Sequence, residues 1–150
     1  MQIAIESAKM GMETNMGGPF GAVIVRNGEV IAVAHNEVIG TNDPTAHAEV
    51  VALRRATATL GRFDIADCEI YSTCEPCPMC LSAIHWAGIR TLYFGADRHD
   101  AAVGGFDDEF IYQLMAGTAD SPLLRPVIVD RQECADLFKE WNAKPDRTMY

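Results

Sequence analysis

TAHAE at residues 45–49 and EPCPMC at residues 75–80 decide the fold and the chemistry of this 150-residue chain. They supply one imidazole nitrogen, from His47, and two sulfur atoms, from Cys77 and Cys80. Zinc prefers such nitrogen and sulfur donors in tetrahedral geometry. A structural zinc site closes with a fourth protein ligand, whereas a catalytic site leaves that position open for water. The three donors therefore predict a zinc site.

A carboxylate, Glu49, stands two residues after His47. It is badly placed to bind the same ion from one helical face and well placed to hold a proton beside it. The order His-x-Glu and then Pro-Cys-x-x-Cys resembles the zinc-dependent nucleobase and nucleoside deaminases. In such a site zinc lowers the pKa of bound water to near ~7, and the carboxylate passes protons to the ring and the leaving amine. The competing interpretation of Glu49 is an exposed first-turn glutamate favoured by the helix dipole.

Two other interpretations of the cysteines stay open. Cys77 and Cys80 could form a reducible thiol pair, as in thioredoxin-like proteins, although an odd total of five cysteines argues against a disulfide framework. The zinc could instead be structural, with Cys74, His85 or His99 as a fourth protein ligand. A structural-zinc binding domain without enzymatic activity is the non-enzyme alternative.

The bulk composition indicates one domain over residues 1–150, with 143–150 as a polar tail. The net charge of −9 disfavours a nucleic-acid partner, because an acidic surface repels polyanions, and it favours a small neutral substrate such as a free base. The chain starts without a signal-peptide pattern, and no apolar run approaches the ~20 residues of a membrane span. We therefore expect a soluble, cytoplasmic protein with no membrane partner.

Apolar periodicity and turn residues predict strands that alternate with helices. Helices are expected at residues 1–16, 45–60, 77–87, 107–115 and 131–142, and strands at 20–25, 29–35, 68–73, 89–94 and 124–129. Asn27 and Gly28 predict a hairpin turn between the first two strands, and the continuous apolar run of the second suggests burial on both faces. The pattern indicates an α/β fold with three layers, α/β/α, around a mixed five-stranded sheet.

Other side chains could contact a flat substrate. Asn36 follows a strand and precedes the zinc helix, where its amide could donate to and accept from the edge of a base, or simply form a turn. Phe20 and Trp86 could stack on a flat ring, or serve in ordinary core packing. The residue pattern alone does not choose between these roles.

Longer motifs make the resemblance closer. GGPFGAV (17–23), NDPTAHAE (42–49), CEPCPMC (74–80) and GFDD (105–108) look like segments of the bacterial guanine deaminases in the cytidine and deoxycytidylate deaminase superfamily. The first three are shared with tRNA adenosine deaminases and cytosine deaminases, so they specify the chemistry. The GFDD segment and a chain that ends in Tyr150 are more discriminating.

The resemblance implies a cytidine-deaminase-like fold and zinc-dependent hydrolysis of guanine to xanthine and ammonia, with water attacking C2. It also implies a homodimer with one zinc ion per subunit, in which an exchanged C-terminal segment closes the partner's site. The implied roles are zinc ligation by His47, Cys77 and Cys80, proton transfer by Glu49, a second acidic group at Asp108, and contact with the base by Asn36, Phe20, Trp86 and Tyr150. Ser82, His85 and the tail at 144–149 depart from the family pattern, so guanosine, cytosine and tRNA adenosine stay open as substrates.

Overall fold

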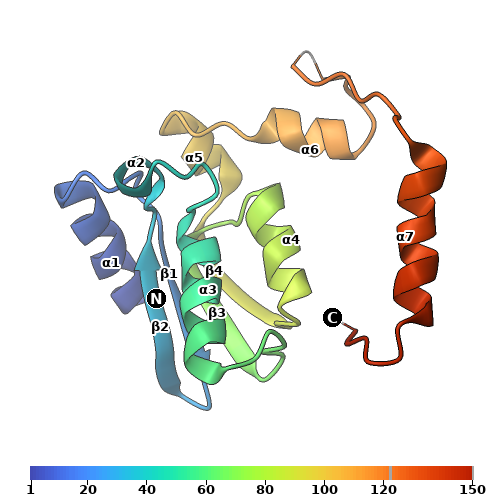
Figure 1. Cartoon of the computed structure of the whole chain (residues 1–150). Helices are drawn as coiled ribbons and strands as arrows, with labels where there is room; N and C mark the ends of the chain where they lie inside the picture. The colour runs from blue at the N-terminus through green and yellow to red at the C-terminus, as the bar shows by residue number, and fades with distance from the viewer. Residues whose placement is uncertain (122, 150) are drawn as a thin grey trace.

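The computed structural model describes residues 1–121 and 123–149. Within these ranges a four-stranded sheet in the order β2-β1-β3-β4 lies at the centre of the fold (Figure 1). Its strands are β1 (Gly21–Arg26), β2 (Glu29–His35), β3 (Cys68–Cys74) and β4 (Thr91–Ala96). The helices are α1 (Gln2–Glu13), α2 (Val38–Thr41), α3 (Ala48–Leu60), α4 (Pro78–Trp86), α5 (Arg98–Val103), α6 (Glu109–Met115) and α7 (Arg131–Ala143).

The strand pairing follows from one hairpin and one crossover. β1 and β2 are antiparallel and are joined by Asn27 and Gly28, whose positive φ angles of 51° and 80° suit a tight hairpin turn. β3 pairs antiparallel with the other side of β1. β3 and β4 are parallel, because the helix α4 carries the chain back between them. The hairpin, the crossover and the mixed sheet confirm the predicted α/β topology.

Helices cover both faces of the sheet. α1 packs closely on one face, where a Cβ atom on Gly21 would lie 2.0 Å from the carbonyl oxygen of Ala4. α3 and α4 lie on the other face (Figure 1). The main hydrophobic core, which includes the fully buried Ile24 and Ile70, forms beneath them. The predicted three-layer arrangement is therefore correct, and it fixes the starts of α3 and α4 near one end of the sheet.

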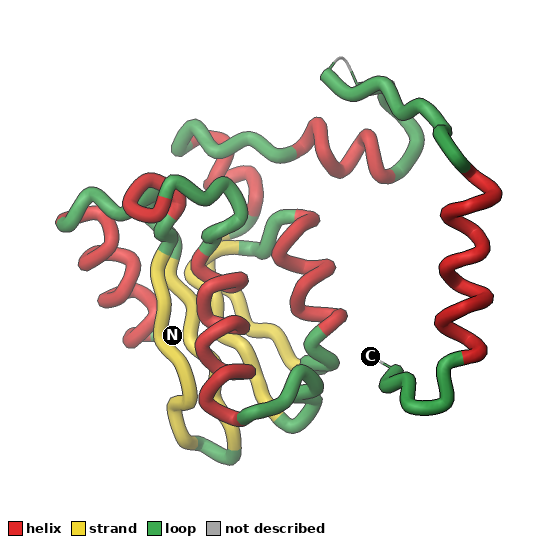
Figure 2. The backbone as a smooth tube through the Cα atoms, in the orientation of Figure 1, coloured by secondary structure: helices red, strands yellow, loops and turns green. Residues whose placement is uncertain are grey.

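The predicted fifth strand at residues 124–129 is wrong, because this segment forms no strand and the sheet of the described chain has four. The segment lies away from the sheet and from its edge strand β4 (Figure 2). Leu124, Val127 and Ile128 are 69%, 78% and 81% exposed. Their residue types favour a strand, but a strand needs an adjacent edge to satisfy its backbone hydrogen bonds.

Two smaller expectations also fail. β2 is not buried on both faces: it is an edge strand, with Val30 exposed and Ala32 buried. Residues 97–106, where no helix or strand is predicted, contain α5, which begins because the Asp97 side chain accepts hydrogen bonds from two backbone N–H groups of the first turn. Neither difference alters the arrangement of the central layers.

The C-terminal part of the chain lies away from the sheet. α7 stands apart from the other helices, at the end of an extended connection (Figure 1). Its apolar side chains Leu137 and Phe138 are largely exposed. None of the helices in the described residues is both long enough and apolar enough to cross a membrane.

Candidate active site

His47 is fixed by the turn that starts α3. Oδ1 of Asp43 accepts hydrogen bonds from the backbone N–H and the hydroxyl of Thr45, at 2.8 and 2.7 Å. Asp43 thereby shapes a tight turn, and His47 follows as the N-cap of α3 with an extended backbone. The imidazole therefore projects from a rigid turn at the end of the sheet rather than from the middle of a helix.

The two cysteines lie at the start of α4. Cys77 is the N-cap residue, Pro78 occupies the first turn, and Cys80 follows three residues after Cys77. Residues three apart lie on the same side of a helix, so both sulfur atoms face His47. The positive end of the helix dipole favours thiolates there.

The three predicted ligands form one cluster. Nδ1 of His47 lies 3.5 Å from Sγ of Cys77 and 3.5 Å from Sγ of Cys80, and the three donor atoms are all within 4.8 Å of one another. Among the described residues, no fourth His, Cys, Asp or Glu donor joins this group. The alternative fourth ligands Cys74, His85 and His99 thus lie outside it. One nitrogen and two sulfurs with an open fourth position fit a catalytic zinc ion.

The electrostatics of the pair also suit a cation. A hydrogen bond from the Cys80 thiol, with a further one from His47, holds the pKa of Cys77 well below that of a free thiol. One thiolate therefore forms readily even before a cation is present. Because thiolate is the form that binds metal, zinc binding would release the remaining thiol proton.

Glu49 is the buried carboxylate of the site. It is 4% exposed, and its Oε1 accepts a hydrogen bond of 2.8 Å from the hydroxyl of Ser72. Burial raises the pKa of Glu49, so this group takes up and gives away a proton more readily near neutral pH. The interpretation of Glu49 as an exposed first-turn glutamate is wrong.

Ser72 is a site residue that the motifs did not reveal. It is 1% exposed and stands on β3 at an inward position between the buried Ile70 and Cys74. A buried hydroxyl almost always has a hydrogen-bonding partner. A serine in the inward series of a strand was therefore the available signal, although the sequence could not show that its partner is Glu49.

A cavity of about 580 Å³ opens over this cluster. Of the predicted site residues, it is lined by Phe20, Asn36, His47, Glu49, Cys77 and Asp108. Cys80 is fully buried behind it. The fold thus brings together residues from just before β1, just after β2, the starts of α3 and α4, and the segment before α6, which lie far apart in the sequence.

Asn36 presents a defined group to this cavity. It is 6% exposed, its N–H donates to the carbonyl of Phe20 at 2.9 Å, and its Oδ1 accepts from the N–H of Val38 at 3.2 Å. Val38 already donates to the oxygen, and the amide nitrogen Nδ2 is the donor that a ligand can use. Asn36 can therefore donate a hydrogen bond into the cavity.

Asp108 and Phe106 come from the GFDD segment. Asp108 is the N-cap residue of α6, but its side chain makes no capping hydrogen bond there. Burial raises the pKa of Asp108. Phe106, which the motif analysis did not assign, packs edge-on against Phe20 with ring centres 4.9 Å apart. The segment adds a third carboxylate, beside Glu49 and Glu75, and a second aromatic wall to the cavity.

Trp86 lies elsewhere within this chain. It is 71% exposed and does not line the cavity over Glu49. It lines a second cavity together with residues of α7 and of the tail, among them Phe138 and Met149. Tyr150, predicted to close the pocket, lies outside the described residues.

Comparison with known proteins agrees with this geometry. Residues 1–96 match the cytidine and deoxycytidylate deaminase zinc-binding region. The chain is 43% identical over 147 residues to a guanine deaminase of Bacillus subtilis (strain 168), covering 98% of this chain and 94% of that protein. It is 38% identical over 109 residues to a tRNA-specific adenosine deaminase of Aquifex aeolicus (strain VF5), covering 71% of this chain and 72% of that protein.

Solved structures show the same likeness. The X-ray structure of guanine deaminase from Bacillus subtilis matches with a TM-score of 0.94 and 42% identity, over 99% of this chain and 95% of that chain. A structure of guanine deaminase from Nitrosomonas europaea matches with a TM-score of 0.67 and 29% identity, over 95% of this chain and 82% of that chain. With the three-donor cluster already described, these matches show that the chain belongs to the cytidine and deoxycytidylate deaminase family of zinc-dependent hydrolases.

Proposed function

We propose that this enzyme hydrolyses guanine to xanthine and ammonia. The observation that carries the proposal is that Asp108 lines the cavity together with Glu49. Asp108 lies beyond residues 1–96, the part of the chain that matches the zinc-binding region of the family. It belongs to the GFDD segment, and the match to the guanine deaminase of Bacillus subtilis extends over 98% of the chain.

The reacting edge of guanine offers a hydrogen-bonding group to each of Glu49 and Asp108. C2 carries the amino group and lies between N3, which accepts a hydrogen bond, and N1–H, which donates one. In adenine and cytosine, the carbon that bears the amine has a ring nitrogen on one side only. A protonated Glu49 suits N3, and the carboxylate of Asp108 suits the N1–H or the amine. The placement of Glu49 and Asp108 on one cavity therefore matches guanine better than these other bases.

Glu49 is proposed to move the protons. As the oxygen of water bonds to C2, Glu49 takes a proton from that water and gives it to N3. Glu49 then transfers the remaining hydroxyl proton to the amine, the C2–N bond breaks, and ammonia leaves as the C2 carbonyl of xanthine forms. Zinc held by His47, Cys77 and Cys80 would supply the Lewis acid that lowers the pKa of water.

Asn36 and Phe20 are proposed to hold the base. The Nδ2 group of Asn36 is free to donate to an acceptor such as a ring nitrogen or the C6 carbonyl of guanine. The ring of Phe20, supported by Phe106, offers a flat apolar wall. One polar contact and one aromatic wall would orient a flat base over Glu49.

Charge supports a free base over a nucleic acid. The net charge of −9 opposes the binding of a polyanion such as tRNA, which usually requires a basic surface. We also propose a cytoplasmic location, because Cys77 and Cys80 must stay reduced to bind metal. The five cysteines are all free thiols in the described chain.

We propose further that the protein is a homodimer in which the C-terminal segments are exchanged. In the described chain, residues 123–129 and α7 expose a large apolar surface. The extended position of α7 is not peculiar to this chain, since the structure of the Bacillus subtilis enzyme matches 99% of it with a TM-score of 0.94. Exposed apolar patches of this kind typically mark protein interfaces. A second copy would offer the uncovered edge of β4 to residues 123–129.

Exchange of the C-terminal segments also bears on Trp86 and Tyr150. Trp86 lies beside the tail rather than beside Glu49 of its own chain. In the exchanged dimer, we expect Tyr150 and the tail to reach the cavity of the second copy and to exclude water from it. Water exclusion strengthens the electrostatic interactions in a site and so favours the reaction.

Ammonia release by the zinc-loaded protein tests the substrate. The panel consists of guanine, guanosine, adenine, adenosine, cytosine and cytidine, and a tRNA substrate is tested at two salt concentrations. We expect a clear preference for guanine, with xanthine formed in equal amount to ammonia. Preference for another base or nucleoside would discard guanine and keep the zinc chemistry. Salt-sensitive activity on tRNA alone would contradict the proposal.

A further inference from the structure

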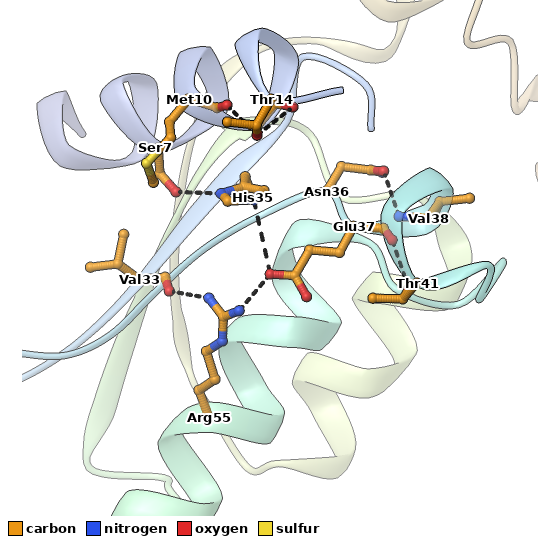
Figure 3. Close-up of polar contacts among 11 residues, drawn as sticks. Ser7, Met10, Thr14, Val33, His35, Asn36, Glu37, Val38, Thr41 and Arg55 are labelled. Atoms are coloured by element: carbon orange, nitrogen blue, oxygen red, sulfur yellow. Dashed lines mark hydrogen bonds and ion pairs between the residues drawn. The ribbon is translucent and has the colours of Figure 1, made fainter. Parts of the chain in front are cut away.

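A polar cluster that the proposed reaction does not use lies directly behind Asn36. It consists of Ser7 on α1, His35 at the end of β2, Glu37 before α2 and Arg55 on α3 (Figure 3). His35 and Glu37 are the two sequence neighbours of Asn36, and their side chains are only 13% and 14% exposed. Neither lines the cavity over Glu49, so both act from behind it.

Arg55 joins the two ends of this short segment. One guanidinium nitrogen donates to Oε1 of Glu37 at 2.5 Å, and the other donates to the carbonyl oxygen of Val33 at 2.8 Å (Figure 3). A planar guanidinium offers these donors in fixed directions, which a lysine ammonium cannot do. The bridge therefore fixes the backbone between Val33 and Glu37, which includes Asn36.

His35 fills the space between this bridge and α1. Its Nε2 lies 4.0 Å from the same Oε1 of Glu37, and its Nδ1 lies 3.4 Å from Oγ of Ser7. The ring also lies against Gly11, where a Cβ atom would come within 2.7 Å of it. Such close packing leaves His35 little room to move.

The cluster reaches the cavity through the backbone of Asn36. On its other side, Gly17 is so close that a Cβ atom there would lie 2.1 Å from Oδ1 of Asn36. The N–H of Glu37 also donates to the carbonyl of Ala46, next to the ligand His47, at 2.9 Å. Asn36 is thus packed between Gly17 and the cluster, and a shift of the backbone behind it would move the amide. A misplacement of about 1 Å can lower a rate ~100-fold.

We propose that Glu37 and Arg55, with His35 packed between Glu37 and α1, are positioning residues that aim Nδ2 of Asn36 at the base. This inference rests on the proposed function, because it requires a base that Asn36 contacts. The proposed proton transfers belong to Glu49, not to Asn36. Loss of the Glu37–Arg55 bridge should therefore raise KM more than it lowers kcat.

A double-mutant cycle of Glu37→Ala and Asn36→Ala tests whether Glu37 acts through Asn36. We expect Glu37→Ala to lower kcat/KM for guanine about tenfold in the wild-type background, mostly through KM, and less than about twofold when Asn36 is already alanine. An equal loss in both backgrounds would overturn the proposal, because it would mean that Glu37 acts independently of Asn36.

If Glu37→Ala does not fold, conservative variants test the same proposal. Glu37→Gln preserves the shape of the side chain but removes its charge. Arg55→Lys preserves the charge but cannot bridge Glu37 and Val33 at once. Both variants should therefore raise KM. The matched control is Arg62→Lys, whose guanidinium pairs with Asp67 away from the cavity and should leave KM unchanged. Unchanged KM in Arg55→Lys, or an equal rise in the control, would contradict the proposal.

Binding separates this inference from the proposed reaction. The same cycle is measured by calorimetric binding of guanine to zinc-loaded protein carrying Glu49→Gln, which requires no turnover. A roughly tenfold weaker affinity that disappears in the Asn36→Ala background supports positioning even if guanine is a poor substrate. Equal weakening in both backgrounds overturns positioning even if guanine is turned over, and absence of guanine binding overturns both.

Discussion

Residues 1–96 and residues 123–149 differ in how far their apolar side chains are buried. In the first region Ile24 and Ile70 are fully buried between the sheet and its helices. In the second, Ile128 and Phe138 are 81% and 71% exposed, on a connection and a helix that stand away from the sheet (Figure 1). The first region buries a core and forms the metal cluster within one chain. The second has the composition of a packed region, but these side chains stay exposed in the described chain, which is why we propose that it packs on a second copy.

The largest effect is expected in the first region, from Glu49→Gln. The variant loses the only proton carrier we assign to the reaction, so turnover should fall by about 10²–10⁴-fold. Zinc content should stay near one ion per chain, because Glu49 is not in the donor cluster. Steady-state turnover and metal analysis check both statements. Glu69→Gln on β3, which does not line the cavity, is the control, and equal losses in the two variants would contradict the role of Glu49.

The next largest effect tests the difference in burial between the two regions. Ile70→Ala removes a fully buried side chain and should lower the free energy of unfolding by about 2–5 kcal/mol. Ile128→Ala should have a smaller effect that depends on protein concentration, because stability that comes from a second copy follows mass action. Denaturant unfolding at several protein concentrations measures both. A large, concentration-independent loss from Ile128→Ala would show that this residue packs within its own chain.

Phe138→Asp tests the second region directly. If α7 packs on a second copy, the charge removes roughly 1.5–3 kcal/mol of apolar burial per site and should shift the protein toward monomer. Sedimentation velocity measures this shift. Val103→Asp, at a 92% exposed position on α5, is the matched control and should leave association unchanged. An unchanged dimer in Phe138→Asp would remove α7 from the interface.

The smallest effect concerns the support of the buried carboxylate. Ser72→Ala removes the hydrogen bond to Glu49, and a net contribution of about 0.5–1.5 kcal/mol corresponds to a loss in kcat of a few-fold to about tenfold. Ser82→Ala is the control, because its hydroxyl bonds only to the backbone of its own helix. Full activity in Ser72→Ala would mean that Glu49 keeps its position and its proton affinity without this hydrogen bond.

Local signals explain why the first region could be predicted. Asn27 and Gly28 specify a hairpin by their backbone preferences, and the three-residue spacing of Cys77 and Cys80 puts two sulfurs on one helix face. These features depend on a few neighbouring residues. The motifs did not assign Ser72 to the site. A buried hydroxyl is expected to have a hydrogen-bonding partner, but the sequence does not show which residue that partner is.

The same reasoning failed in the second region for a physical reason. Residues 124–129 have the side chains of a strand, but a strand exists only where an edge is available to pair with it. Whether that edge belongs to the same chain is a property of the assembly and not of the segment. Trp86 shows the same limit, since an aromatic suited to stacking on a base lies beside α7 instead of beside Glu49.

The claim that the two regions complete each other across a dimer is tested most directly by mixing two inactive variants. One carries Glu49→Gln with an intact tail, and the other lacks residues 143–150 and keeps Glu49. Each alone should deaminate guanine slowly, and we predict that activity returns when the two are unfolded together and refolded as a mixture, because a heterodimer has one intact cavity closed by one intact tail. No gain over the separate proteins, or full activity in the truncated variant alone, would contradict exchange of the C-terminal segment.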